Sequence, residues 1–490
     1  MEKKKEMFVI IGSLLVIILS VTLAYFTVQI VGKGKEISAS SADLKITFSS
    51  GSGNISSSNI EPGWSSGTST FTVKNESKDT YKYNIVIKDL VNTFVTTGYL
   101  QYKITSADGG YNMSKFQDIP KSTAAKDEIL AYSVEIAKGK THSYSIEFKY
   151  FNSSNDQSDD MGKELSGTLY IEKGTLPPTL AEKLLADNPT IKTRTAFNTV
   201  FTETNIGTLY KATESIAGGT AKDVYYFAGD AKNNWVKFAG FYWRIIRTNH
   251  DGSVRLLYSG TSPDTTEGYI AKSAFNSSSN DSMYVGYMYG TSGSLDNNRT
   301  NKNNSAIKGV LDSWYSTNLS SYSKYISTEA VYCNDRELAS GSTYNNYTLY
   351  FYKKVLNDDG SYASYDCDET KDAFSGSNTE AKLTYPIALM TADEAVIAGC
   401  KAGEYCNLWY NRNSVGGSIT GSAGWWLLTP DSVKEGIPYM WGVNIIYHGG
   451  ISTRDISYNL AVRPVISIQG DTLYSSGDGS PENPYQIVYN

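Results

Sequence analysis

The sequence predicts three parts in order: an N-terminal transmembrane or signal helix, an all-β sandwich domain, and a mixed α+β domain. An unbroken apolar segment runs from Met7 to Val31. Apolar and polar residues then alternate from Leu44 to about Lys173, the period of half-buried strands. Beyond this stretch, strand-like runs are mixed with segments that begin with helix-capping residues. The assigned ranges are 1–36 for export, 37–175 for the sandwich, 176–205 for a linker with a short helix, and 206–490 for the α+β domain with a C-terminal tail.

The apolar segment predicts export. Lysines precede it at positions 3 to 5, and about 20 apolar residues are enough to cross a bilayer as a helix. A cationic leader keeps the N-terminus inside and sends the remainder outward. Two outcomes stay open: an uncleaved anchor formed by residues 7–31, or a signal peptide cut after Thr22-Leu23-Ala24 to leave Tyr25 as the first residue. The bulk of the protein is extracellular in both cases.

Composition narrows the functional class. The 490 residues are too many for one hydrophobic core. A net charge of −6, with only 19% charged residues, argues against a basic surface for nucleic acid. The 38 tyrosines, accompanied by Ser, Gly and Asn, are typical of binding loops, although extracellular β proteins are often rich in the same residues. The sequence has three scattered histidines and no Cys-x-x-Cys motif, so we predict no metal site and no cofactor.

Residues 37–175 read as several short antiparallel strands. Alternation is clearest in 81–87 and 144–150, and turn-forming clusters such as Glu61-Pro62-Gly63 separate the runs. A period of two places one face of each strand on a core and the other in water. Short strands spaced in this way predict a sandwich.

Three capped helices are predicted downstream. Thr179 and Glu182 form a capping box for a helix over 180–187. Ser305 caps an amphipathic helix that begins at 306, and Thr391 with Glu394 caps another that ends before a glycine at 399.

The four cysteines predict two disulfides. An even count in an exported chain favours pairing, and four cysteines allow three connectivities. We favour the pairing of neighbours, Cys333 with Cys367 and Cys400 with Cys406. Reduced thiols remain the alternative.

Short motifs near the N-terminus carry a first resemblance. They are Ala24-Tyr25-Phe26-Thr27, Ala42-Asp43-Leu44-Lys45-Ile46, Ile60-Glu61-Pro62-Gly63 and Phe71-Thr72-Val73-Lys74-Asn75. Over residues 1–175 this order resembles the TasA and camelysin family of bacterial matrix-fibre proteins. The resemblance implies a jelly-roll-like sandwich, a dedicated signal peptidase, and fibre assembly by donation of an N-terminal strand. The apolar run beyond Tyr25 departs from this pattern, because it also suits an uncleaved anchor.

A second resemblance covers about residues 206–470. Its motifs are Gly240-Phe241-Tyr242-Trp243-Arg244-Ile245-Ile246-Arg247, Tyr332-Cys333-Asn334-Asp335-Arg336, Thr391-Ala392-Asp393-Glu394, Trp425-Trp426-Leu427-Leu428-Thr429-Pro430 and Val462-Arg463-Pro464-Val465. This series is similar to an uncharacterised family of bacterial surface domains. The resemblance implies a C-type-lectin-like fold, akin to formylglycine-generating enzymes and phage tropism proteins.

Candidate ligand-binding residues lie between the Trp425 and Arg463 strands, the region that forms an exposed ligand face in the resembling folds. They are Tyr439, Trp441, Asn444, Tyr447, His448 and Arg454. Aromatic rings beside amides suit sugars or protein epitopes. Ordinary strand alternation, with Trp441 and Val443 facing inward, is the alternative. Trp243, Trp425 and Trp426 are predicted to be core, and Arg463 a structural hydrogen-bond donor.

The leading hypothesis is therefore an exported, membrane-anchored surface protein with an adhesin-like C-terminal head for a glycan or protein ligand. A structural subunit of an extracellular (biofilm) matrix fibre, self-assembling through the sandwich, is the alternative. A metal-dependent enzyme of the formylglycine-generating or camelysin type comes third, because neither a His-Glu-x-x-His helix nor a nucleophile elbow occurs in the sequence. We expect no catalytic residue.

Overall fold

The computed structural model describes residues 24–29, 36–38, 44–47, 55–96, 98–204, 206–350, 363–444 and 449–489. The chain divides into two compact units, Met1–Pro177 and Pro178–Asn490. Strands dominate both units, and each unit has its own hydrophobic core. The sheet-rich architecture predicted from the alternating pattern is confirmed.

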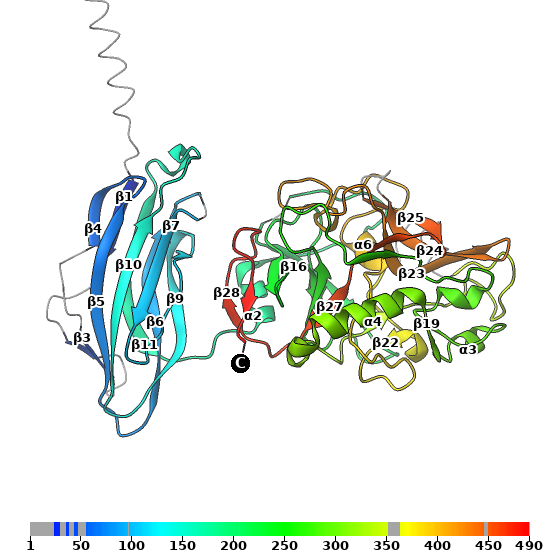
Figure 1. Cartoon of the computed structure of the whole chain (residues 1–490), viewed down its shortest axis with the longest axis horizontal. Helices are drawn as coiled ribbons and strands as arrows, with labels where there is room; N and C mark the ends of the chain where they lie inside the picture. Colours follow the sequence, from blue (N-terminus) through cyan, green and yellow to red (C-terminus); the bar gives the residue numbers. More distant parts are fainter. Residues whose placement is uncertain are drawn as a thin grey trace, which may run out of the picture. The chain divides into compact units, whose positions relative to one another are not determined.

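The first unit consists of two sheets that share one core (Figure 1). One sheet has the order β4-β1-β11-β6-β9 and the other β2-β3-β5-β10-β7-β8. The strands are β1 Ala24–Gln29, β2 Glu36–Ser38, β3 Leu44–Thr47, β4 Ile55–Ile60, β5 Ser65–Asn75, β6 Tyr81–Asn92, β7 Leu100–Ser106, β8 Gln117–Asp118, β9 Ser122–Ile136, β10 Thr141–Tyr150 and β11 Glu164–Lys173.

Strand alternation explains the core of this unit. Along β10, every second side chain from His142 to Tyr150 is buried, and the residues between them are exposed or half-buried. Phe71 of β5 stacks on Tyr144 of β10 with ring centroids 4.8 Å apart. Because the apolar set of each strand lies on one face, two such sheets bury these faces against each other.

The N-terminal prediction needs a correction at its end. The strand β1 pairs in parallel with β11 and antiparallel with β4, so Ala24–Gln29 is part of a sheet rather than the end of a membrane helix. Aromatic and β-branched residues such as Phe26 and Val28 favour a strand once neighbouring backbone groups are available. The remainder of the predicted segment, 7–23 and 30–31, lies outside the described residues. Among the residues that are described, no helix is long and apolar enough to cross a membrane.

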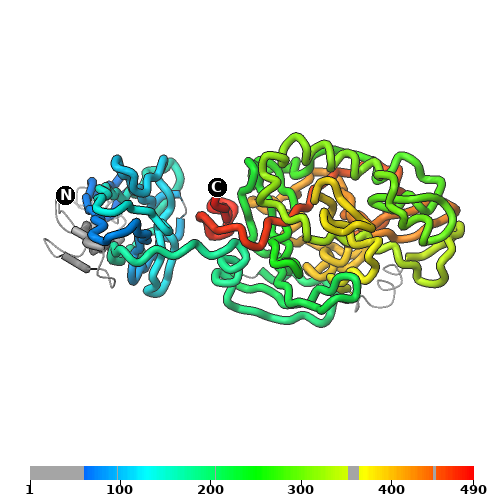
Figure 2. The backbone as a smooth tube through the Cα atoms, turned by 90° about the horizontal axis from the view of Figure 1, so that it is seen from below, coloured from blue at the N-terminus to red at the C-terminus, as the bar shows by residue number. Residues whose placement is uncertain are grey.

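The predicted linker also needs a correction. Residues from Pro178 onward belong to the second unit, where β12 (Thr190–Thr193) pairs in parallel with β13 (Thr208–Glu214). The helix α2, Leu180–Asp187, has the predicted capping box, and its Leu180 and Leu184 are buried in the core. Figure 2 shows the C-terminal segment beside this stretch, consistent with the Thr179–Leu473 bridge. The apolar face of α2 therefore ties this stretch to the second unit.

Two larger sheets organise the second unit (Figure 1). The first has the order β12-β13-β14-β16-β17-β27, with β15 paired to β16, and the second the order β18-β26-β23-β24-β25. Their further strands are β14 Lys222–Tyr226, β15 Trp235–Phe238, β16 Phe241–Thr248, β17 Val254–Tyr258, β18 Ala271–Ser273, β23 Trp425–Lys434, β24 Ile437–Asn444, β25 Gly450–Asp455, β26 Leu460–Val462 and β27 Val465–Ile468.

Short elements complete this unit. They are β19 Met288–Tyr289, α3 Leu295–Asn298, β20 Asn303–Asn304, α4 Ala306–Asn318, β21 Tyr332–Cys333, β22 Ala373–Phe374, α6 Ala392–Ile397, β28 Tyr474–Ser476 and β29 Gln486–Ile487. The helix α4 begins after Ser305, whose side chain accepts a hydrogen bond from Lys308 N, and α6 has the predicted capping box of Thr391 and Glu394. Both helix predictions are confirmed.

The predicted core residues are also confirmed. Trp243, Trp425 and Trp426 are each at most 1% exposed. Arg463 is fully buried and donates to the carbonyl oxygens of Tyr258 and Tyr410, at 3.1 and 2.5 Å. Its guanidinium thus satisfies backbone groups inside the unit, in agreement with the predicted role of Arg463 as a structural hydrogen-bond donor.

Candidate ligand-binding site

The structure does not assemble the predicted ligand face. Trp441 is only 5% exposed and Asn444 only 8%, so neither presents its side chain to a large ligand. Both lie on β24, which has β23 on one side and β25 on the other, and the strand is buried on both faces from Met440 onward. The inward-facing alternative is therefore correct for Trp441 and for Val443, which is 4% exposed.

The other members of that set are dispersed. Tyr439 and Arg454 are half-buried, and the ammonium group of Lys434 lies 4.6 Å from the centre of the Tyr439 ring. Tyr447 and His448 lie outside the described residues. The described candidates thus do not converge on one exposed site.

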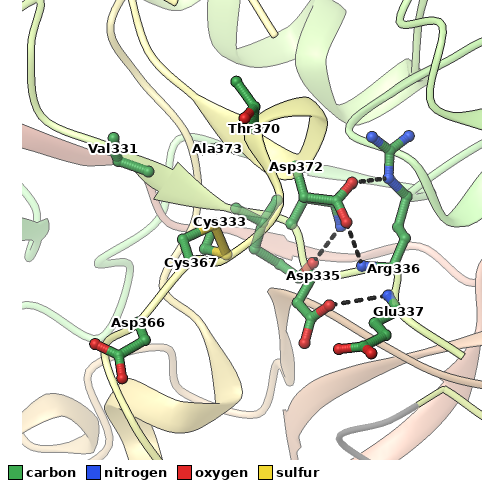
Figure 3. The surroundings of a disulfide bond; sticks show 12 residues. Val331, Cys333, Asp335, Arg336, Glu337, Asp366, Cys367, Thr370, Asp372 and Ala373 are labelled. Atoms are coloured by element: carbon green, nitrogen blue, oxygen red, sulfur yellow. Dashed lines mark hydrogen bonds and ion pairs between the residues drawn. A yellow bond between two sulfur atoms is a disulfide. The ribbon is translucent and has the colours of Figure 1, made fainter. Parts of the chain in front are cut away.

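The two disulfides join Cys333 to Cys367 and Cys400 to Cys406, the neighbour pairing expected from the sequence. The first bond connects two short segments that are rich in carboxylates. Asp335 and Glu337 follow Cys333, and Asp366 and Asp368 flank Cys367. Figure 3 shows Asp335 and Asp366 on opposite sides of this bond. The cross-link therefore concentrates negative charge.

A cavity of about 100 Å³ lies at this disulfide. Nine carboxylates and two guanidinium groups line it, which leaves seven excess negative charges if all are ionised. The acidic lining residues are Glu214, Asp335, Glu337, Asp366, Asp368, Glu369, Asp372, Asp393 and Glu394, and the basic ones are Arg247 and Arg255. We refer to this site as the acidic cavity.

Part of this charge is compensated by buried ion pairs. Arg247 contacts Glu214 at 2.8 Å and Glu394 at 3.2 Å, and Arg255 contacts Glu394 at 2.7 Å. Burial alone would raise the pKa of Glu214, but Arg247 and the hydrogen bonds from His250 lower it to about 2. These ion pairs hold one wall of the acidic cavity in place, because separating the partners would leave an uncompensated buried charge.

Asp372 is held in the same way. Its carboxylate contacts Arg336 at 2.6 Å and Arg299 at 2.5 Å, and both the Asp372 and Arg336 side chains are at most 1% exposed. Arg336 N also donates to Asp372 Oδ2 at 2.9 Å (Figure 3). This pairing fixes the backbone next to Asp335.

Asp335 and Asp393 form no ion pair in the described part of the chain. Asp335 is half-buried, and its Oδ1 accepts a hydrogen bond from Glu337 N at 2.9 Å. Burial, followed by the charge of Asp372, raises the pKa of Asp335 to about 7. Burial and the charge of Asp335 raise the pKa of Asp393 well above its usual range. Both carboxyl groups therefore bind a proton more readily than an ordinary aspartate does.

Tyr365 adds a neutral polar group to the acidic cavity. It is 6% exposed, and the Arg247 guanidinium lies 4.4 Å from its ring centre. Within the described ranges, its hydroxyl forms no hydrogen bond to another residue. Burial raises the pKa of this phenol well above its usual range, so the hydroxyl stays protonated. Tyr365 lines the acidic cavity, and no described residue occupies its hydroxyl, so the hydroxyl is available to a ligand.

This arrangement suits an organic cation. Excess negative charge in a recessed, partly desolvated site attracts ammonium or guanidinium groups, which donate hydrogen bonds to carboxylates. Over the described ranges, no group of three or more His, Cys, Asp or Glu is arranged to hold a metal ion.

Part of this site was visible in the sequence. The predicted disulfide alone brings together the carboxylates that follow Cys333 and those that flank Cys367. Asp393 was named only as part of the Thr391-Ala392-Asp393-Glu394 motif, and Glu214 carried no local signal. Long-range folding brings these two residues to the site.

Comparisons with known proteins do not identify a family. Neither a protein-family profile nor a curated protein matches the chain. Among solved structures, a family 123 glycoside hydrolase from Clostridium perfringens is similar at 10% identity over 34% of this chain and 37% of that chain. The TM-score of 0.12 is too low to support any inference about fold or function.

Proposed function

We propose that this protein is an exported surface binding protein whose second unit binds a cationic group of its ligand in the acidic cavity. The observation that carries the proposal is the uncompensated pair of Asp335 and Asp393 beside the unpartnered hydroxyl of Tyr365. A bound ammonium or guanidinium group would offset the repulsion between the two carboxylates. The partner is a protein or glycan that carries such a group.

An extracellular setting accords with both disulfides, since such bonds persist in oxidising compartments. The lysine-flanked apolar segment would direct export, and residues 7–31 were its predicted membrane contact. The sheet pairing of β1 favours a chain whose membrane segment or cleaved signal ends before Ala24. The first unit would then serve as a stalk.

The resemblances belong to the same proposal. A jelly-roll-like first unit and a C-type-lectin-like second unit would fit a surface protein that presents a binding head. We propose binding rather than catalysis, because structural ion pairs hold Glu214, Asp372 and Glu394 in place at the wall of the acidic cavity.

Calorimetric titration with lysine-containing and arginine-containing peptides tests the proposal. The wild-type protein should bind them, and their norleucine analogues should not bind. Asp393→Asn should weaken binding at least tenfold at pH 8. Asp223→Asn changes an exposed carboxylate that pairs with Lys211 outside the cavity, and should leave binding unchanged. Equal affinity for the neutral analogue would refute a cation site.

A matrix-fibre subunit is the second candidate, favoured by one observation. The chain supplies its own N-terminal strand, β1, between β4 and β11. If that strand is instead donated between copies, a variant lacking residues 24–29 should remain monomeric while the wild type polymerises. Polymerisation of both forms, or of neither, would argue against donation.

A further inference from the structure

A second cavity, of about 160 Å³, lies in the second unit where Trp425 of β23 pairs with Val443 of β24. Its polar lining comes from the amides of Asn407 and Asn411 and the hydroxyls of Ser418 and Thr420. None of its described lining residues is ionisable. We call it the neutral cavity. Its composition is the opposite of that of the acidic cavity, so it does not favour an ion.

Two buried side chains leave hydrogen-bonding atoms unused at this cavity. Trp425 is 1% exposed, and its indole N–H donates to no other residue in the described part of the chain. Asn411 is 8% exposed; its Nδ2 donates to the carbonyl oxygens of Cys406 and Gly449 at 3.0 and 2.9 Å. The Oδ1 of Asn411 accepts no hydrogen bond from a described residue. One donor and one acceptor, each on a side chain that is more than nine-tenths buried, therefore line the same space.

The neutral cavity is held rigidly. The Cys400–Cys406 disulfide closes the chain just before Asn407. Gly449 has a φ of +92°, and a Cβ at this position would overlap the Asn411 amide. The loop that contributes Ser418 is fixed by Asn413, whose Oδ1 accepts from Gly417 N at 2.8 Å and whose Nδ2 donates to Asp264 O at 2.9 Å. A site with fixed polar groups loses little conformational entropy when a ligand binds.

These features indicate the chemistry of the ligand. A hydroxyl group both donates and accepts, so it can satisfy Trp425 Nε1 and Asn411 Oδ1 together. Ala423 and Val443 add apolar surface beside these polar groups, which suits the C–H face of a sugar ring. A charged group would find no counter-charge among the described lining residues. We infer that the neutral cavity binds an uncharged sugar residue of a surface glycan, independently of the acidic cavity.

An array of immobilised oligosaccharides tests this inference with the purified protein. It should include neutral, N-acetylated, sulfated and sialylated glycans. The wild type should retain a subset of the neutral or N-acetylated glycans. Ser418→Tyr adds a ring at an exposed lining position and should reduce that signal at least tenfold. Ser422→Tyr, an exposed position of the same loop outside the lining, should stay within twofold.

Three results would overturn the inference: retention of no uncharged glycan, retention of acidic glycans alone, or equal binding by Ser418→Tyr. Asn407→Ala provides a second variant in case Ser418→Tyr does not fold, and it should weaken binding about fivefold or more. Asp335→Asn should leave glycan binding unchanged. The same variant should weaken the binding of cationic peptides. The two assays therefore distinguish failure of the glycan inference from failure of the proposed function.

Discussion

Replacement of Asp335 by asparagine should stabilise the second unit at pH 8 but not at pH 4. Asparagine retains an Oδ1 acceptor for Glu337 N, so the hydrogen bond at 2.9 Å survives. The pKa of Asp335 is about 7 in the folded protein, whereas its ordinary value is 3.8. At a pH between these two pKa values, folding therefore requires the carboxyl group of Asp335 to bind a proton.

The sign of the effect follows from proton linkage. Below pH 4, both the folded and unfolded states carry the proton, so Asp335 adds no pH dependence. Between pH 4 and 7, the unfolded state loses the proton and the folded state keeps it, so the free energy of unfolding falls as pH rises. Above pH 7, the full loss is present.

The magnitude follows from the same two values. The interval from 3.8 to about 7 corresponds to an upper limit of about 4 kcal/mol, at roughly 1.4 kcal/mol per tenfold change in proton affinity. Because Asp335 is only half-buried, solvent screening reduces this limit, and we expect a gain of about 1 to 3 kcal/mol for Asp335→Asn at pH 8.

Urea denaturation at pH 4 and pH 8, followed by tryptophan fluorescence, measures this gain. Seven of the eight tryptophans lie in the second unit, since only Trp64 precedes Pro178. Asp368→Asn, at an exposed carboxylate of the same cavity, is the matched control and should change stability by less than about 0.5 kcal/mol. A variant that loses stability at pH 8, or gains equally at both pH values, would refute the reasoning.

Three further outcomes are expected. Titration calorimetry should show affinity for cationic peptides falling as pH drops from 8 to 5, because Asp335 gains a proton; an unchanged affinity would contradict its role. Replacing both Cys333 and Cys367 by serine opens a loop with a sequence separation of 34. Urea denaturation should then show a decrease of about 3 to 4 kcal/mol in the free energy of unfolding. Full retention of stability would contradict a stabilising role of this disulfide. In the first unit, Asn75→Ala removes donors to Asp79 O and Ile136 O; circular dichroism in urea should show a loss of about 2 kcal/mol, and a neutral change would contradict this account.

Local signals in the sequence predicted the three capped helices and several strands of the first unit. The capping residues Thr179, Ser305 and Thr391 each stand directly before a helix. Period-two alternation predicted the strands of the first unit, because the two faces of a strand differ in burial. These features depend on contacts within a few residues, so one sequence is enough to reveal them.

Predictions that depended on burial had mixed outcomes. Trp243 and Arg463 were correctly assigned to the interior, since each lies in an apolar run. Trp441 was assigned to a ligand face, yet the structure buries it, because β24 is covered on both faces from Met440 onward. The local sequence pattern does not show whether a strand is covered on one face or on both. It therefore does not distinguish an exposed aromatic residue from a buried one.

The candidate sites were decided by tertiary structure. The acidic cavity joins Glu214, Asp335, Asp366 and Asp393, which are far apart in the chain, and only the predicted disulfide hinted at part of this group. The sheet pairing of β1 likewise depends on β11, well over 100 residues away. The sequence by itself predicted a β-rich, disulfide-bonded protein with particular helices. Which carboxylates meet, and which remain uncompensated, depends on long-range packing that no local pattern encodes.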